Sequence, residues 1–191
     1  MTSFDLSFLD NLAEQVAPRL LGCILERDID GQAVRVKIVE TEAYDQTDEA
    51  SHSYRGRTVK NEVMFGPAGH LYVYFTYGMH YCCNIVVGEN GYGAAVLIRA
   101  VEPITGEATL AKRRVVKRPV ELTNGPAKLT QALAIDRELN GHDLTKSPLK
   151  LYWQPSLAAS QVSSARRVGI SRGQSKLWRF YITDNPYLSI R

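Results

Sequence analysis

The sequence has few cysteines, no long hydrophobic run and no strong excess of charge of either sign. Its three cysteines, Cys23, Cys82 and Cys83, are too few and too badly spaced for a disulfide framework, and none has the Cys-x-x-Cys or Cys/His spacing of a zinc site. We therefore expect reduced thiols and a cytoplasmic compartment. The first ten residues contain neither a basic region nor a long apolar stretch, so we expect no signal peptide and no transmembrane helix.

Length and composition predict one globular domain. The chain has 191 residues, of which 45% are hydrophobic and 23% are charged. No segment of low complexity, internal repeat or shift of composition marks a boundary, so we expect a single domain over residues 1–191. The net charge of +3 is only mildly basic. Such a charge permits nucleic-acid binding without predicting it, so local clusters must decide that question.

Residues 34–44 are the first of two central segments. Aliphatic and charged side chains alternate over residues 34–38, the period of a half-buried strand. If this period continues, Glu40, Glu42 and Tyr44 lie on the same face as the aliphatic side chains. Two carboxylates on an apolar face are costly unless they are paired, hydrogen-bonded or used in chemistry. Glu42 is then a base that holds a water, a metal ligand, or a structural carboxylate satisfied by Arg35, Lys37 or a loop amide.

The second central segment covers residues 71–87 and predicts two strands that meet near Tyr77 and Gly78. An exposed aromatic side chain at a hairpin tip is suited to act as a wedge between stacked bases, which is the role we predict for Tyr77. Tyr44 and Tyr74 can form walls on which an extruded base stacks. For Phe75 and Tyr81 we expect ordinary core packing instead.

The remaining pattern completes an antiparallel α+β fold with peripheral helices. A third strand over residues 94–101 follows the hairpin by a short turn, which predicts a meander, and Arg99 is its one charge. Because Arg99 is isolated among apolar residues, it can keep Glu42 ionised or orient a water, or it can serve as a structural ion-pair partner. The other expected elements are helices over residues 7–16, 107–117 and 126–135, strands near 23–27, 149–153 and 177–182, and polar loops over 45–58 and 163–176.

Polar residues of two loops are candidates for ligand contacts. His52, in the loop that follows Glu42, is the histidine best placed to touch a ligand. The helix start after Gly125 and Pro126 carries Lys128, which is suited to hold a DNA phosphate. Further basic residues either face solvent or form the edge of a DNA-binding surface; they are Lys112, Arg113, Arg114, Lys117, Arg118, Arg166, Arg167 and Arg172.

Several motifs follow one another in one order over residues 20–190: Val39-Glu40-Thr41-Glu42-Ala43-Tyr44, Ala50-Ser51-His52-Ser53, Met64-Phe65-Gly66-Pro67-Ala68-Gly69, Leu71-Tyr72-Val73-Tyr74, Tyr77-Gly78-Met79, Leu97-Ile98-Arg99-Ala100-Val101-Glu102-Pro103, Asn124-Gly125-Pro126-Ala127-Lys128-Leu129 and Arg167-Val168-Gly169-Ile170. Together they resemble the alkyladenine (3-methyladenine) DNA glycosylase family. Ala127 departs from the glycine or serine usual in this family, and for His80 the family gives no expectation.

The resemblance implies a role for each matching residue. Glu42 matches the general base, Arg99 its partner in holding the water, and Val168 the position whose carbonyl helps to hold that water. Tyr44, His52 and Tyr74 match the pocket around the flipped purine, and Asn84 matches a polar residue at its edge. Tyr77 matches the side chain that fills the vacated stack, and Met79 its neighbour in the minor groove, where the resemblance places a protruding hairpin.

The reaction implied is excision of alkylated or deaminated purines from double-stranded DNA in base-excision repair. Neither a metal nor a cofactor is required, and no membrane is involved. We expect a monomer that works at the bacterial nucleoid. Two other readings stay open: a non-catalytic nucleic-acid-binding module on the same scaffold, and a metal-dependent hydrolase that uses Glu40, Glu42, Asp45 and Asp48.

Overall fold

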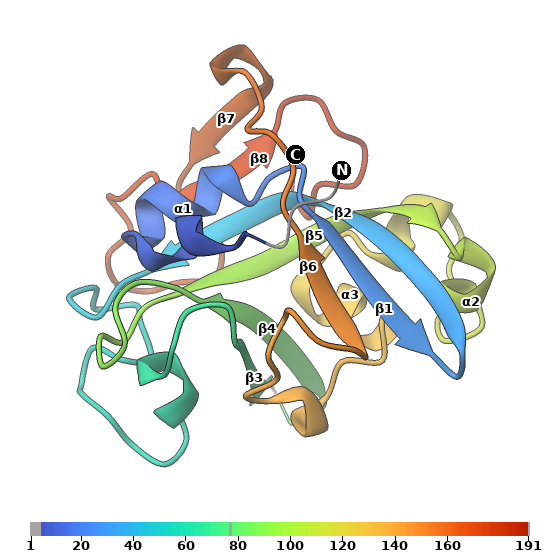
Figure 1. The fold of residues 1–191 in the computed structure, drawn as a ribbon. Helices are drawn as coiled ribbons and strands as arrows, with labels where there is room; N and C mark the ends of the chain where they lie inside the picture. The colour runs from blue at the N-terminus through green and yellow to red at the C-terminus, as the bar shows by residue number, and fades with distance from the viewer. Residues whose placement is uncertain (1–4, 77, 191) are drawn as a thin grey trace.

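The computed structural model describes residues 5–76 and 78–190 and has one antiparallel sheet as its framework (Figure 1). Six strands follow the order β3-β4-β5-β2-β1-β6, and β8 pairs with both β2 and β7. The strands are β1 (Ile24–Ile29), β2 (Gln32–Tyr44), β3 (Leu71–Thr76), β4 (His80–Val86), β5 (Ala95–Thr105), β6 (Leu149–Tyr152), β7 (Val162–Ala165) and β8 (Arg179–Ile182). The α-helices are α1 (Ala13–Arg19), α2 (Glu107–Ala111) and α3 (Pro126–Ala132), so the predicted α+β class is confirmed.

The strand β2 lies at the centre of this sheet because it pairs with β1, β5 and β8. Its pairing with β5 is irregular at the middle. Ile38 pairs with Val101 and Glu40 with Ala100, so Val39 is left without a partner in this register. Thr41 then pairs with Ile98, which leaves Arg99 without one on β5. Each strand therefore carries an extra residue at this point, the arrangement of a β-bulge, which re-aims the side chains beyond it.

This irregularity overturns the predicted face of Glu42. Beyond the bulge Thr41 Oγ donates to the carbonyl of Ala17 in α1 at 2.9 Å, and Ala43 joins the main core that contains Ile38. Because side chains alternate along a strand, Glu42 points to the face opposite the aliphatic residues 34–38. The prediction that they share a face was wrong because one extra residue reverses the alternation.

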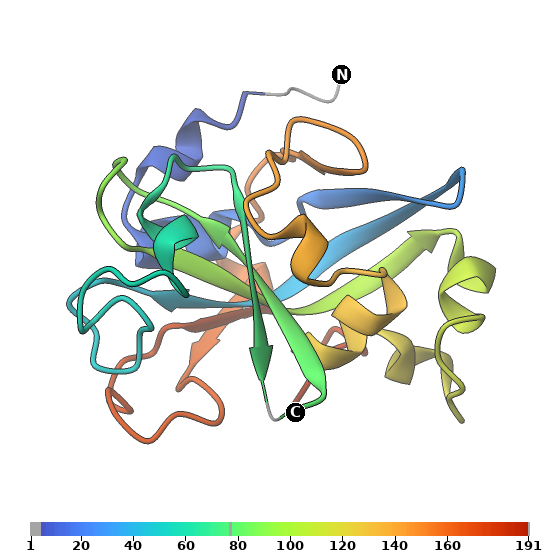
Figure 2. The same cartoon turned by 90° about the horizontal axis from the view of Figure 1, so that it is seen from below.

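β3 and β4 pair antiparallel, and β4 pairs with β5 in the same way, as the predicted meander requires (Figure 2); that this pair protrudes as a hairpin stays a prediction. Tyr77 lies outside the described residues, and its role as a wedge stays a prediction. Beside it Met79 is 70% exposed and Phe75 is 46% exposed, so the expectation of core packing for Phe75 was wrong. Tyr81 does pack against the core, with its ring 5.1 Å from that of Phe75.

The peripheral helices are shorter than predicted. Instead of one helix over residues 7–16, a 3₁₀ turn at Ser7–Asp10 precedes α1, and the Asn11 side chain bonds the Phe8 carbonyl at 3.1 Å where the turn ends. The predicted helix over residues 107–117 ends at Ala111, and the Arg113 side chain beyond it donates to the carbonyl of Gln131 in α3 at 3.3 Å. Part of the expected loop 163–176 is strand β7, which pairs with β8.

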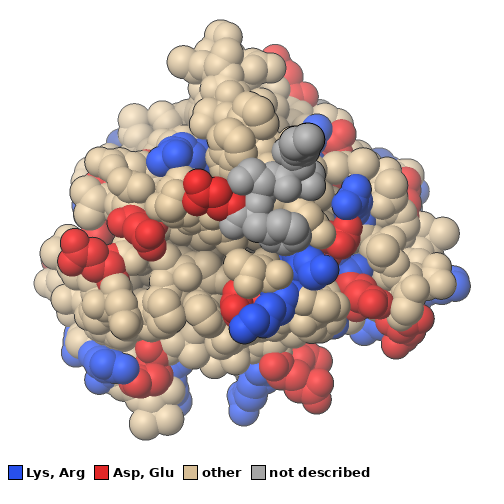
Figure 3. Space-filling model, in the orientation of Figure 1, with Lys and Arg blue, Asp and Glu red and all other residues tan. Residues whose placement is uncertain are grey.

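The charges on the face that carries α1 and β6 are mixed. Lysine and arginine side chains alternate with aspartate and glutamate there, without a continuous patch of one sign on the visible face (Figure 3). This view therefore offers no extended basic surface. No helix in the described part of the chain is long and apolar enough to cross a membrane.

Candidate active site

A cavity of about 720 Å³ opens between the sheet and two loops. Figure 2 shows the loop 45–58 and the segment 166–176 on the same side of the β3–β4 hairpin, and residues of both line the cavity. The cavity volume lies within the usual range for sites that hold a small molecule. Six residues predicted for catalysis or base binding line it: Tyr44, His52, Tyr74, Asn84, Arg99 and Val168. Arg172, predicted for a solvated or DNA-facing position, lines it too, whereas Glu42 is not part of the lining.

Two predicted DNA contacts do not belong to this cavity. Met79 lines a separate, smaller hollow of about 280 Å³ together with His80 and residues of α3. Lys128 is half-buried on α3, and its ammonium group donates to the side chain of Asn124 at 2.8 Å. Their proposed contacts would therefore lie beside the cavity rather than in it.

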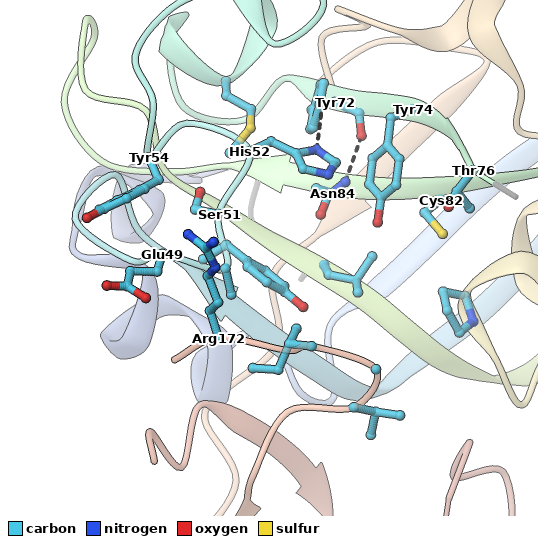
Figure 4. A pocket seen from close by; sticks show the side chains of 18 of the residues that line it. Glu49, Ser51, His52, Tyr54, Tyr72, Tyr74, Thr76, Cys82, Asn84 and Arg172 are labelled. Atoms are coloured by element: carbon cyan, nitrogen blue, oxygen red, sulfur yellow. Dashed lines mark hydrogen bonds between the residues drawn. The ribbon is translucent and has the colours of Figure 1, made fainter. Parts of the chain in front are cut away.

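One wall of the cavity is aromatic and comes from His52 and β3 (Figure 4). The His52 ring stands edge-on to Tyr74, with ring centroids 4.6 Å apart, and its Nδ1 hydrogen-bonds the Tyr72 hydroxyl at 3.0 Å. Burial lowers the pKa of His52 below its ordinary value, so the neutral ring is favoured near pH 7. Burial also raises the pKa of Tyr72 to about 12. This wall is therefore uncharged at neutral pH.

Tyr72 and Cys82 are the wall residues that sequence reasoning did not assign. Tyr72 was given no role from the sequence, although residues two apart in a strand share a face, so its spacing from Tyr74 was a signal that both reach the cavity. The two tyrosine rings are 5.7 Å apart at an interplanar angle of 31°. The Asn84 amide donates to the Tyr72 carbonyl at 3.1 Å, so its orientation is held by the β3 backbone (Figure 4).

The carboxylate of Glu42 is fully buried and is in contact with three residues of the cavity lining, through two hydrogen bonds and one ion pair. Its Oε1 accepts from the backbone N–H of Val168 at 2.7 Å. Its Oε2 accepts from the Tyr44 hydroxyl at 2.8 Å and lies 3.3 Å from Arg99 Nη1. The burial of Tyr44, then the charge of Glu42, raises the pKa of the tyrosine, which therefore remains a hydrogen donor. Of the structural partners expected for Glu42, the loop amide is present as the Val168 N–H, whereas Arg35 and Lys37 pair with Glu26 and Glu102.

Glu40 is also fully buried but lies in a denser set of contacts. Its Oε1 accepts from Arg179 Nε at 2.7 Å and from Arg99 Nε at 3.2 Å. Both its oxygens are further bonded by Ser189, through the hydroxyl at 2.8 Å and the backbone N–H at 2.6 Å. Two carboxylates and two guanidinium groups thus form one buried cluster whose formal charges cancel. This pairing offsets the desolvation cost of burying the charges.

Arg167 was predicted to edge a DNA-binding surface, but its side chain is 0% exposed. The guanidinium lies between the rings of Tyr44 and Trp178, at 4.7 and 5.4 Å from their centroids. It donates to the carboxylate of Asp48 and to the Ala43 carbonyl. Arg167 therefore joins β2, the loop 45–58 and the segment 166–176, and it is not free to reach a phosphate.

The four carboxylates of the metal-hydrolase alternative do not converge. Asp45 accepts from Tyr92 and Thr47, Asp48 pairs with Arg167, and Glu40 belongs to the arginine cluster. Among residues 5–76 and 78–190, no group of three His, Cys, Asp or Glu side chains is placed to hold a metal ion. The described geometry does not favour this alternative.

Comparison with known proteins gives a consistent family. The sequence profile described as methylpurine-DNA glycosylase matches residues 7–186. A protein of Carboxydothermus hydrogenoformans is 51% identical over 175 residues, which cover 91% of this chain and 92% of the relative. A protein of Methanoculleus marisnigri is 44% identical over 188 residues, with 97% of each chain covered. Both relatives carry the provisional name 3-methyladenine DNA glycosylase.

Proposed function

The chain belongs to the methylpurine-DNA glycosylase family, and we propose that it excises alkylated and deaminated purines from duplex DNA by attack of a water that Glu42 activates. The membership itself makes it a DNA glycosylase, a hydrolase of the N-glycosidic bond. The proposed substrates are 3-methyladenine, 7-methylguanine, hypoxanthine and ethenoadenine. The observation that carries the proposal is a buried carboxylate held by three lining residues of an aromatic cavity.

The aromatic wall supports recognition of a base that is turned out of the helix. An alkylated purine carries a positive charge, and a cation against aromatic faces gains roughly 1–2 kcal/mol from the rings. Neutral His52 adds no repulsion to such a cation. Tyr44 and Tyr74 are the proposed walls, and Asn84 meets the edge of the base. A neutral substrate such as hypoxanthine must in addition receive a proton as it leaves.

The contacts of Glu42 support its role as the base. A carboxylate offers about four acceptor positions, and two accept hydrogen bonds from Val168 and Tyr44, while Arg99 contributes an ion pair at 3.3 Å. In the described part of the chain no further hydrogen bond reaches Oε1, which keeps a lone pair for the proposed water. Glu42 is fully buried, so the proposal requires this water to reach the carboxylate from the cavity that Tyr44, Arg99 and Val168 line. The water oxygen attacks the sugar carbon, its proton passes to Glu42, and the electrons of the broken C–N bond leave with the base. The Arg99 guanidinium and the Val168 carbonyl are proposed to orient this water.

The DNA contacts are proposed from the sequence resemblance. Tyr77 fills the space of the extruded nucleotide, Met79 contacts the minor groove and Lys128 contacts a phosphate. The large exposed fraction of Met79 is compatible with this assignment. We further propose a monomer that releases the base without cutting the strand, and that works at the nucleoid.

One assay separates the proposal from its alternatives. The protein is incubated in EDTA with duplexes that carry hypoxanthine or an alkylated adenine, and the products are treated with hot alkali. Alkali-dependent cleavage at the lesion is the expected result, with Glu42→Gln as the inactive control. Activity only after addition of a divalent metal would favour the metal-dependent hydrolase, and binding without cleavage would favour the non-catalytic module.

Cleavage before the alkali step, or a protein–DNA adduct trapped by borohydride, would contradict the water mechanism. Either result would indicate that an amine of the protein attacks the sugar. A water-activating glycosylase forms no such covalent intermediate.

A further inference from the structure

The contact between Arg99 and Glu42 depends on groups outside the cavity. Only one nitrogen of the guanidinium, Nη1, meets Glu42, and at 3.3 Å this contact is long for a charged pair. The other nitrogens are held from the opposite side. Nε bonds Glu40 at 3.2 Å, and Nε and Nη2 reach the Ser189 hydroxyl at 3.4 and 3.3 Å. The orientation of Arg99 is therefore decided by Glu40 and Ser189 as much as by Glu42.

The Ser189 hydroxyl bonds both the Arg99 guanidinium and the Glu40 carboxylate. A hydroxyl has one hydrogen to donate and lone pairs to accept. It donates to Glu40 at 2.8 Å, so it is the acceptor for Arg99. Its own backbone N–H is used on the second Glu40 oxygen at 2.6 Å. An alanine at this position would keep the backbone bond and lose only the bridge to Arg99 and Glu40.

The segment around Ser189 is fixed independently of the cavity. Leu188 packs with Val39, the extra residue of the β2 bulge, and with Ala100, the neighbour of the extra residue Arg99 on β5. The Ile190 carbonyl accepts from Arg179 at 2.7 Å. Because the residues on both sides of Ser189 are held in place, its hydroxyl has a fixed position and can fix the orientation of the Arg99 guanidinium. These contacts distinguish Ser189 from a surface serine that merely happens to lie near an arginine.

We propose that Ser189 is a positioning residue, which holds the Arg99 guanidinium against Glu42 in the geometry needed for water attack. The inference rests on the proposed function, because it assigns Arg99 and Glu42 to the chemical step. Ser189 touches neither the cavity nor the reacting atoms. It acts through the guanidinium, so it should affect the rate of base release and leave lesion binding unchanged.

The test compares three variants under single-turnover conditions with saturating enzyme. Ser189→Ala should slow base release about tenfold, the size expected when one hydrogen bond to a charged group is lost. Its affinity for lesion duplex should stay close to that of the wild type. Its melting temperature should fall by several degrees while the protein stays folded, because the lost hydrogen bond joins buried charged groups. Ser189→Thr keeps the hydroxyl and should restore most of the rate. Ser163→Ala removes a comparable hydroxyl, bonded to Thr183 at 2.9 Å, and should be fully active.

A Ser189→Ala rate equal to that of Ser163→Ala would overturn the proposal, and so would a loss of rate matched by an equal loss of affinity. These failures differ from failure of the proposed function, which would show as an active Glu42→Gln or an inactive wild type. NMR gives a readout that needs no activity. The Arg99 Nε–H signal, assigned with Arg99→Lys, should exchange slowly with solvent in the wild type and faster in Ser189→Ala, and an unchanged exchange rate would contradict the contact.

Discussion

Replacing Glu42 with glutamine is the change that tests the proposed chemistry most directly. The substitution keeps the size and shape of the side chain but removes its ability to take a proton from water. A general base contributes about 10²–10⁴-fold to a rate, so base release should fall by at least this factor. The aromatic wall is untouched, and binding of a lesion duplex should persist.

The structure also gives the expected cost in stability. The glutamine carbonyl can still accept from Val168, but its amide would face Arg99 Nη1, which lies 3.3 Å from the present carboxylate oxygen. Arg99 retains its pair with Glu40. The Tyr44 hydroxyl also loses its acceptor, because an amide nitrogen cannot accept a hydrogen bond. The loss therefore corresponds to one hydrogen bond to a charged group and one long ion pair, at least roughly 1.5–3 kcal/mol. Glu40→Gln should cost more, because Glu40 alone is shared by two arginines, whereas it should keep measurable base release.

The assay is single-turnover base release from a duplex with one lesion, followed by alkaline cleavage and gel separation. Binding is measured in parallel by a gel shift, and urea unfolding confirms that each variant is folded. A Glu42→Gln protein that releases base at the wild-type rate would refute the reasoning. A loss of binding equal to the loss of rate would also refute it, because the carboxylate would then act in recognition.

Four further predictions address the DNA contacts, the fold and the effect of pH. Tyr77→Ala should weaken productive binding of lesion duplex with little change in stability, since a wedge compensates on the order of a few kcal/mol of unstacking; equal excision at limiting enzyme would exclude that role. Lys128→Ala should weaken binding to damaged and undamaged DNA alike and reduce the slope of log K against log salt by about one, and an unchanged slope would remove it from the phosphate contacts. Arg167→Met should lower the free energy of unfolding by roughly 3–5 kcal/mol in urea titrations, because it leaves the buried carboxylate of Asp48 without its partner. Arg35→Met breaks an exposed ion pair and should cost under about 1 kcal/mol, so similar values for the two variants would contradict the argument. Burial lowers the pKa of His52, so below about pH 6.5 the unfolded chain takes up a proton that the folded chain does not. The free energy of unfolding should therefore fall from pH 7 to pH 5 more in the wild type than in His52→Gln, and an equal fall in both would contradict this argument.

Short-range patterns in the sequence determined where several strands and loops of this protein lie. Alternation over residues 34–38 and 71–87 was enough to predict the central strand and the β3–β4 hairpin, because a strand's side-chain period is local. The polar composition of residues 45–58 predicted the loop that carries His52 to the cavity. The resemblance to a family then gathered Tyr44, His52, Tyr74, Asn84, Arg99 and Val168, which do line one cavity.

Only the tertiary structure decided how the charges are paired. The paired irregularities at Val39 and Arg99 depend on the register between two strands, and they turn Glu42 away from the aliphatic face that local alternation predicts. Arg167 reads as a surface charge in sequence, yet packing between two aromatic rings buries it. Ser189 hydrogen-bonds Glu40, from which it is separated by 149 positions in the sequence. Such contacts arise only when distant segments share a buried volume, where each charge must find a partner, and no local period encodes which partner it finds.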